Sequence, residues 1–304
     1  MTQPHLTRVL LVNHVSTPGG AERGLLDVVK ALPGAPYEIR VVLPSRGWLS
    51  EMLERRGCQA DYLPLERIKR PCHLLAALAV LPGIVRVARQ LARLIRDRRT
   101  DIIHANSSTA QLYAGLAAGM AATHSIWHCR DMVDLGLAGR WMWRRASRVV
   151  ATSRAVADHI RMTVSADERK TVTIPNGIDT EEFEPRGRGD AMRRRQGFLP
   201  EHFVVAMVGQ MVPWKRQDLF IEMAGLVASQ LPAARFLLVG GDLFSEEDAY
   251  VRGLRARVER ARLGDRFVFA GYQEDMAAIY EAVDLVVHPP EREPFGRVVA
   301  EAMA

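Results

Sequence analysis

The chain has 304 residues, which is enough for two domains of ordinary size. Its content of 48% apolar and 25% charged residues is that of a soluble globular protein. The net charge of +6 favours an anionic partner, but no nucleic-acid-binding module or set of stacking aromatics accompanies it, so we expect no nucleic acid as partner.

The cysteines and the apolar runs indicate a cytoplasmic protein. Cys58, Cys72 and Cys129 are odd in number and lack the spacing of metal ligands, so we expect reduced thiols. The N-terminal apolar run, residues 9–12, is too short for a signal peptide. The longest apolar run, residues 74–85, contains Pro82 and is too short to span a bilayer.

The chain begins with a pattern of strand, glycine loop and helix. Residues 9–12 form a short apolar run that predicts a central parallel strand, and a helical stretch covers residues 21–30. Gly19 and Gly20 lie between the two, where backbone amides can approach a phosphate. A second strand is predicted at residues 39–43 and a helix at 50–57.

A basic amphipathic segment follows at residues 74–99, as one or two helices broken near Pro82. Its apolar stripe either lies on an acidic membrane surface or packs on the sheet. The tryptophans and arginines at residues 141–145 also have two interpretations: an interfacial membrane anchor, or packing in the core or in the acceptor site. The arginines of the first segment are Arg86, Arg89, Arg93, Arg96, Arg98 and Arg99.

Two histidines stand at the ends of predicted strands. His104 ends the strand at residues 101–104, and His128 ends the one that starts at residue 125. Ligands of open α/β sheets bind at this edge, although orienting a loop is an equally good role for His104. A further strand, residues 149–152, leads to Ser153, a predicted helix N-cap.

The second half repeats the alternation of strand and helix. Residues 186–202 are polar and rich in arginine, which suits a linker between domains at 1–185 and 203–304. Strands are predicted at residues 203–209, 235–239 and 266–271. Loops with Gln210, Lys215 and Arg216, with Gly240, and with Tyr272 follow them. Such alternation predicts doubly wound parallel sheets.

The last thirty residues hold two carboxylates. A buried strand at 285–287 ends at His288, and Pro294 suits the first position of a new helix. Phe295, Gly296 and Arg297 would then offer backbone N–H groups to a phosphate. Glu293 lies at the mouth of this turn and Glu301 two turns later on nearly the same face, so we expect both in one crevice. The alternative is a solvated helix face.

This segment resembles the paired-glutamate motif of the retaining glycosyltransferases of family 4, with seven residues between the glutamates and Pro-Phe-Gly after the first. The resemblance covers nearly the whole chain, and the loops at 19–22, 125–131, 175–179 and 210–218 match in order. It implies the GT-B architecture, two Rossmann-like domains that face a cleft. Family members continue beyond the last residue here, so we expect a truncated chain whose second domain is incomplete and has an exposed sheet edge.

The resemblance also implies a reaction and roles for single residues. A sugar would pass from a UDP- or GDP-linked donor to a glycan or lipid-linked acceptor with retention, in cell-envelope or exopolysaccharide synthesis. No metal is expected, because no Asp-x-Asp motif occurs, and no cofactor, because the nucleotide-sugar is a substrate. Glu293 and His128 would be catalytic; the donor would contact Gly19, Gly20, Lys215, Phe295, Gly296, Arg297 and Glu301, with Gln210, Arg216, Gly240, Tyr272 and His104 in a second tier.

One position departs from the family pattern. Gln210 stands where many members have an arginine, which should weaken diphosphate binding unless Arg216 or Arg297 compensates. Two other functions remain open. The chain could be another GT-B enzyme, a sugar epimerase or phosphorylase, or a truncated, non-catalytic module that binds a membrane or polyanion. A peripheral position on the inner face of the plasma membrane fits the basic segments.

Overall fold

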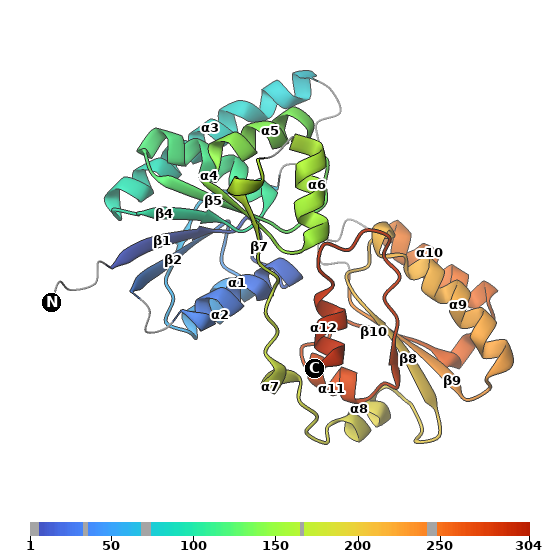
Figure 1. Ribbon diagram of the computed structural model, residues 1–304. Helices are drawn as coiled ribbons and strands as arrows, with labels where there is room; N and C mark the ends of the chain where they lie inside the picture. Colours follow the sequence, from blue (N-terminus) through green and yellow to red (C-terminus); the bar gives the residue numbers. More distant parts are fainter. Residues whose placement is uncertain (1–5, 33–35, 68–73, 165–166, 242–247) are drawn as a thin grey trace. The chain divides into compact units, whose positions relative to one another are not determined.

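The computed structural model describes residues 6–32, 36–67, 74–164, 167–241 and 248–304, and only the backbone at 74–78, 168 and 248. Cys72 therefore lies outside the described residues. The chain divides into two compact units, residues 1–177 and 178–304. Each unit contains one sheet of parallel strands with helices around it (Figure 1). This confirms the predicted α/β class with two parallel sheets, of which the second is smaller.

The sheet of the first unit has seven strands in the order β3-β2-β1-β4-β5-β6-β7. The chain builds outward from β1 in one direction and then from β4 in the other, so the strand order reverses between β1 and β4. Ligands of such sheets bind outside the carboxyl ends of the strands at this reversal. The strands are β1 (Thr7–Val12), β2 (Tyr37–Leu43), β3 (Ala60–Tyr62), β4 (Ile102–Ala105), β5 (His124–Cys129), β6 (Arg148–Ala151) and β7 (Thr171–Thr173).

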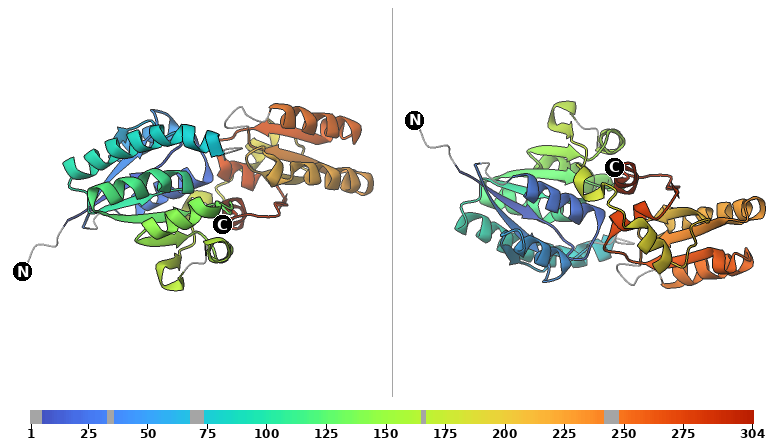
Figure 2. Two further views of the ribbon diagram at one scale, coloured as in Figure 1. Left: turned by 90° about the horizontal axis from the view of Figure 1, so that it is seen from above. Right: turned by 90° about the horizontal axis from the view of Figure 1, so that it is seen from below.

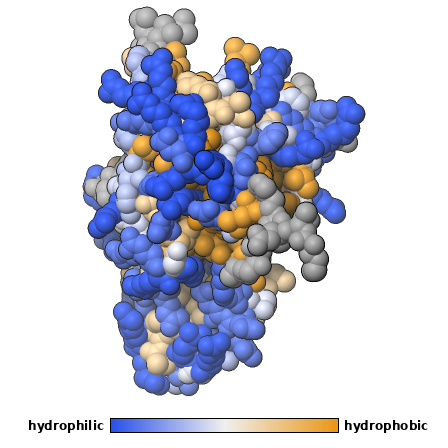
Figure 3. All heavy atoms as spheres, turned by 90° about the vertical axis from the view of Figure 1, so that its left-hand side faces the viewer, coloured by the Kyte–Doolittle hydropathy of each residue, from blue (hydrophilic) through white to orange (hydrophobic). Residues whose placement is uncertain are grey.

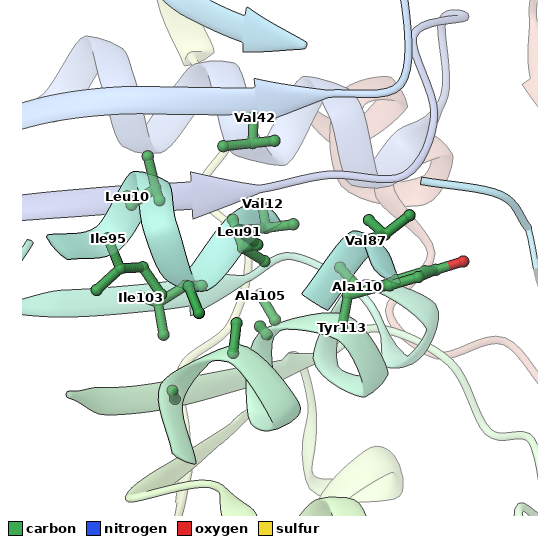
Figure 4. Packing of buried hydrophobic residues seen from close by; sticks show 14 of the residues in the cluster. Leu10, Val12, Val42, Val87, Leu91, Ile95, Ile103, Ala105, Ala110 and Tyr113 are labelled. Atoms are coloured by element: carbon green, nitrogen blue, oxygen red, sulfur yellow. The ribbon is translucent and has the colours of Figure 1, made fainter. Parts of the chain in front are cut away.

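Helices cover both faces of this sheet (Figure 2). Leu11 and Val41 face one way and are buried with residues of α1 and α2, whereas Leu10 and Val12 face the other way, toward α3 and α4 (Figure 4). Successive residues of a strand point to opposite faces, which explains the continuous apolar runs. The helices are α1 (Gly20–Ala31), α2 (Trp48–Glu54), α3 (Leu74–Asp97), α4 (Ser108–Ala121), α5 (Gly136–Arg145) and α6 (Arg154–Val164), with a 3-10 turn, Glu168–Lys170.

Helix α3 differs from the sequence prediction in one respect, and it shows whether its apolar stripe packs on the sheet or is free for a membrane surface. It runs through Pro82 without the expected break. Val87, Leu91 and Ile95 are almost fully buried in the core of the sheet (Figure 4), and this burial outweighs the cost of about 3 kcal/mol that an internal proline imposes on a helix. The apolar stripe therefore packs on the sheet, and the six arginines point outward.

The aromatic segment in α5 also belongs to the core. Trp141 and Trp143 pack against the buried cluster of β5, β6 and α6, with the Arg145 guanidinium 5.7 Å from the Trp141 ring centroid and the Lys170 ammonium 4.3 Å from that of Trp143. At the start of α6, the Ser153 hydroxyl accepts a hydrogen bond from the Val156 N–H, which confirms the predicted N-cap. Within the described residues, no helix has both the length and the apolar character needed to cross a membrane.

The second unit has a four-stranded sheet in the order β10-β9-β8-β11. Helices α9 and α10 enclose a phenylalanine-rich core on one face, and α8 and α11 pack on the other. The strands are β8 (Phe203–Val208), β9 (Ala234–Val239), β10 (Phe267–Gly271) and β11 (Leu285–Val286). The helices are α7 (Thr180–Phe183), α8 (Gly189–Arg195), α9 (Gln217–Gln230), α10 (Asp248–Arg260), α11 (Met276–Glu281) and α12 (Arg297–Met303), with 3-10 turns Pro213–Lys215 and Gly264–Arg266.

Residues 186–202, where we expected a linker, belong to this second unit. Met192 and Phe198 are buried beside α11. The Glu281 carboxylate accepts hydrogen bonds from the backbone N–H groups of Arg186, Arg188 and Gly189. The side chains of Arg188 and Arg193 also form ion pairs, with Glu281 at 3.2 Å and with Asp284 at 2.6 Å, so part of the arginine-rich character of the segment serves intramolecular contacts. The division between the units falls earlier, after Gly177.

Candidate functional site

The glycine loop after β1 is shaped by a buried carboxylate. Gly19 precedes α1 in an extended conformation that any residue could adopt, but a Cβ there would lie 2.3 Å from Oε2 of Glu22. The close approach of Glu22 therefore explains this glycine, while Gly20 forms the first turn of α1. Glu22 is only 7% exposed, and burial raises its pKa, although a hydrogen bond from Asn13 and the charge of Arg130 oppose the rise.

The two histidines predicted at strand ends lie together. His104 is on β4 and His128 on the neighbouring β5, and Nε2 of His104 lies 3.2 Å from Nδ1 of His128. Burial, helped by the charge of Arg130, lowers the pKa of His104 to about 4 and that of His128 to about 2. Both rings are therefore neutral near pH 7. Nε2 of His128 is buried and has no hydrogen-bond partner among the described residues.

Arg130 is central to this group, and the sequence prediction missed it. Its Nη2 lies 3.3 Å from Nδ1 of His128, its Nε donates to Oδ1 of Asn106 at 2.9 Å, and its Nη1 donates to Oδ1 of Asn176 at 2.6 Å. Asn106 follows β4, just as Asn13 follows β1. A polar residue directly after each strand at the reversal of strand order was the available signal.

In the second unit, Glu293 and Lys215 form an ion pair. Nζ of Lys215 lies 2.5 Å from Oε2 of Glu293, and Nε2 of His288 lies 3.0 Å from the same oxygen. Burial alone would raise the pKa of Glu293, but the His288 hydrogen bond and the Lys215 charge outweigh it and lower the pKa. The carboxylate is thus held in its ionised form. His288 was not among the predicted site residues, although it lies near the carboxyl end of its strand, β11, as His104 and His128 lie near the ends of β4 and β5.

The turn after Glu293 differs from the prediction. Gly296 has φ 78°, in the left-handed region, and α12 begins only at Arg297 rather than at Pro294. Phe295 precedes this turn and is half-buried. Because Glu293 lies outside the helix, the expectation that it shares a helix face with Glu301 is wrong.

The two glutamates therefore belong to separate hydrogen-bond groups. Glu301 is 6% exposed and accepts from the Tyr280 hydroxyl at 3.0 Å and from Nε of Arg297 at 3.3 Å. Glu293 has Lys215 and His288 as its partners.

The remaining predicted residues surround the loop after β8. The Gln210 carbonyl accepts a hydrogen bond from the side chain of Gln217, which is fully buried and was also missed. Arg216 has φ 60° and pairs with Asp218 and Glu291. Both cations that could compensate for the absent arginine, Arg216 and Arg297, thus have carboxylate partners.

Gly240 lies against this loop, because a Cβ there would be 1.9 Å from the Gly209 carbonyl oxygen. Tyr272 follows β10 and is 41% exposed. Its Cβ lies near Gly241, so the loops after β9 and β10 are neighbours.

Two units, each with one parallel sheet and with polar clusters after its strands, are the architecture of GT-B enzymes. Residues 18–182 match the family described as Glycosyltransferase Family 4, and residues 190–304 match Glycosyl transferases group 1. The chain belongs to the family 4 glycosyltransferases. This confirms the resemblance that the motifs indicated.

Several named proteins are similar to this chain. The GDP-mannose-dependent alpha-mannosyltransferase of Mycobacterium tuberculosis is 26% identical over 98% of this chain and 76% of its own length. The UDP-Gal:alpha-D-GlcNAc-diphosphoundecaprenol alpha-1,3-galactosyltransferase of Escherichia coli is 23% identical over 94% and 74%. A D-inositol 3-phosphate glycosyltransferase of Segniliparus rotundus is 34% identical over 52% of this chain, a match that spans about a third (35%) of that relative.

Solved structures agree with the fold. The crystal structure of Anabaena HepE in complex with UDP-glucose superposes with a TM-score of 0.80 and 27% identity, covering 97% of this chain and 78% of HepE. The Arabidopsis thaliana starch synthase IV catalytic domain, bound to ADP and acarbose, has a TM-score of 0.71 at 14% identity, over 98% and 81% of the two chains. This second likeness concerns the fold alone.

Proposed function

We propose that the protein transfers a sugar, with retention of configuration, from a nucleotide-diphosphate donor to a glycan or lipid-linked acceptor. The observation that carries the proposal is the cluster of Lys215, Glu293 and His288, which joins a cation and an ionised carboxylate after β8 and β11. Membership of both halves of the chain in glycosyltransferase families supports it.

The cluster suits the charges of such a reaction. A departing nucleoside diphosphate develops negative charge, and the Lys215 ammonium is a point charge suited to stabilise it electrostatically. Glu293, kept ionised by its two neighbours, would face the sugar and either stabilise an oxocarbenium-like centre or hold a hydroxyl. We assign no covalent nucleophile.

We place the ribose of the donor at Glu301. Its carboxylate already accepts two hydrogen bonds, from Tyr280 and Arg297. An ionised carboxylate has about four acceptor sites, so it can accept two more from the ribose hydroxyls. Tyr280 and Arg297 would hold the carboxylate in place for that contact.

The similar proteins indicate which sugar donor and which acceptor to propose. HepE is described with UDP-glucose, and the mycobacterial relative is GDP-mannose-dependent, so a UDP- or GDP-linked hexose is the proposed donor. The galactosyltransferase of Escherichia coli acts on a diphosphoundecaprenol-linked sugar. We therefore propose an acceptor of that kind, in cell-envelope or exopolysaccharide synthesis.

We also propose peripheral binding to an anionic inner membrane face through the α3 arginines. Arg86, Arg89 and Arg93 are exposed and form no ion pair with any residue that the structure describes. On the face drawn in Figure 3, hydrophilic side chains predominate, with apolar side chains gathered near the middle of the view. Because Arg86, Arg89 and Arg93 are exposed and charged, we expect the attraction to be electrostatic.

A transfer assay with Glu293→Gln tests the proposed reaction. We expect sugar transfer to fall by about 10²–10³-fold, because the amide keeps the size of the side chain but removes its charge. Glu259→Gln, at an exposed position on α10, is the matched control and should keep full activity. Undiminished turnover of Glu293→Gln would contradict the proposal, and an epimer or sugar phosphate as product would assign the protein to another GT-B reaction.

A further inference from the structure

Two hydrogen-bonding groups meet the same nitrogen of His128. Nε2 of His104 lies 3.2 Å from Nδ1 of His128, and Nη2 of Arg130 lies 3.3 Å from it. A neutral imidazole has one nitrogen that donates and one that accepts, and geometry alone does not say which is which. The identity of the neighbours decides the question.

Arg130 can only donate. A guanidinium carries five N–H donors and no acceptor, and it keeps its charge at every pH at which the protein is folded. An N–H on Nδ1 of His128 would face the guanidinium N–H directly, so Nδ1 must be the acceptor and the proton must be on Nε2. His104 then also donates, from its own Nε2, to the same atom.

The position of Arg130 is fixed by groups from three other segments. Asn106 and Asn176 each present their side-chain oxygen to it, at 2.9 and 2.6 Å. Gly24 on α1 leaves the space, since a Cβ there would lie 2.7 Å from Nη1 of Arg130. The guanidinium is thus held on three sides while its Nη2 faces His128.

The same rule orients the amides beyond Arg130. Because Asn106 presents Oδ1 to Arg130, its Nδ2 donates onward, to Oδ1 of Asn13 at 3.0 Å. Nδ2 of Asn13 then donates to Oε1 of Glu22, also at 3.0 Å. Arg130, Asn106 and Asn13 therefore form one hydrogen-bonded series in which the donor and the acceptor of every contact are determined. The series ends at the buried carboxylate of Glu22.

We propose that Arg130 is a positioning residue that fixes His128 as the neutral Nε2–H tautomer, so that His128 offers a hydrogen-bond donor and not a base. The offered group is the buried Nε2, which has no partner among the described residues. Its ligand would be an oxygen of the bound sugar substrate. That last step rests on the proposed function, whereas the tautomer does not.

Nuclear magnetic resonance of the full chain labelled with ¹⁵N-histidine tests the tautomer directly. Long-range ¹H–¹⁵N correlation distinguishes Nδ1–H, Nε2–H and doubly protonated rings, and His128→Asn and His104→Asn assign the signals. We expect His128 to show only the Nε2–H form from pH 8 down to pH 5.5. A protonated Nδ1 in the unmodified protein would overturn the proposal, whether or not the protein transfers sugar.

Arg130→Met tests whether Arg130 is the cause. The charged and titratable groups that act on His128 are Arg130 and His104, and Glu22 of α1 interacts in turn with Arg130. Without the guanidinium we expect a mixture of tautomers and protonation of His128 at a higher pH than in the parent. The same pure Nε2–H signal and titration in Arg130→Met would refute the role.

Two further variants distinguish a specific role of Arg130 from a general disturbance of the structure. Arg130→Lys keeps a charged donor but loses the paired amide contacts, and we expect it to restore the Nε2–H form at least in part. Arg154→Met, at an exposed position on α6, should leave the His128 signal unchanged. If Arg130→Met does not fold, the Lys variant and the unmodified protein still decide the proposal.

Discussion

At the scale of single residues, contacts with neighbouring groups explain why some positions are glycine, which the sequence pattern alone does not explain. Gly19 and Gly240 are glycines for reasons of space, the first beside a carboxylate and the second against a carbonyl oxygen. Glycine at such points allows backbone to come close to other groups. Gly271, by contrast, has a positive φ of 67° and open space where a Cβ would stand.

These two glycines give a matched stability prediction. Gly271→Ala should cost about 1–2 kcal/mol, the penalty of a left-handed conformation for a residue with a Cβ. Gly240→Ala should cost clearly more, because its Cβ meets the Gly209 carbonyl oxygen at 1.9 Å and the φ of 134° is also unfavourable. Urea denaturation of both variants measures the difference, and equal losses would show that the loop relaxes freely.

The ion pair of Glu293 predicts a specific dependence of stability on pH. The folded state lowers the pKa of Glu293, so its contribution to the free energy of unfolding is present above the unfolded value of about 4.3 and is lost as the pH falls through the folded pKa. The stability difference between the parent and Glu293→Gln should therefore be largest above about pH 5 and shrink in more acidic solution. Denaturation at several pH values measures it, with Glu259→Gln as control. A difference that grows on acidification would reverse the assigned sign.

At the scale of elements, helix α3 has buried apolar side chains on one face and exposed arginines on another. Its apolar stripe from Ile84 to Ile95 is taken up by the core, and Arg86, Arg89 and Arg93 remain exposed for a partner. Replacing Arg86, Arg89 and Arg93 by glutamine should weaken binding to anionic vesicles by roughly 3 kcal/mol, about 1 kcal/mol for each charge near the surface. Co-sedimentation at low and physiological salt measures the loss.

A control for the α3 variant removes the same charge elsewhere. Arg194, Arg195 and Arg252 are exposed on α8 and α10, and their replacement by glutamine should change vesicle binding much less. Equal loss in both triple variants would mean that net charge alone attracts the protein. Binding that persists in high salt would argue for apolar insertion instead.

The elements also show what local sequence can predict. The Ser153 cap and strands such as β1 and β8 depend on neighbours in the chain, and they were predicted. The continuity of α3 through Pro82 depends on burial against distant strands, which no local signal reveals. The start of α12 depends on the left-handed Gly296, whose conformation the residues before it did not indicate.

The residues of the candidate site also divide into those that local sequence predicts and those that depend on distant contacts. Glu293, Lys215 and His128 could be found from motifs, but Arg130 gains its meaning only beside Asn106 and Asn176, which are 24 and 46 positions away. Contacts of this separation require the assembled sheet.

At the scale of the whole molecule, the two units have separate cores, and four of the five tryptophans are in the first unit. The fifth, Trp214, lies in the second unit with the Lys215 ammonium 4.3 Å from its ring centroid. Tryptophan fluorescence therefore follows mainly the first unit, whereas circular dichroism follows both. The two probes can separate the unfolding of the units.

A nucleotide should stabilise the second unit selectively. If the proposed donor site is correct, UDP or GDP at a hundredfold excess over its dissociation constant adds roughly 2.7 kcal/mol, because it binds the folded state alone. We expect one of them, and not ADP, to raise the melting temperature seen by circular dichroism, and Lys215→Ala to abolish the shift. A shift that tryptophan fluorescence shows as fully as circular dichroism would place the nucleotide in the first unit. The same shift in Lys215→Ala would mean that the cation at residue 215 does not bind the diphosphate, and the role proposed for Lys215 would have to be withdrawn.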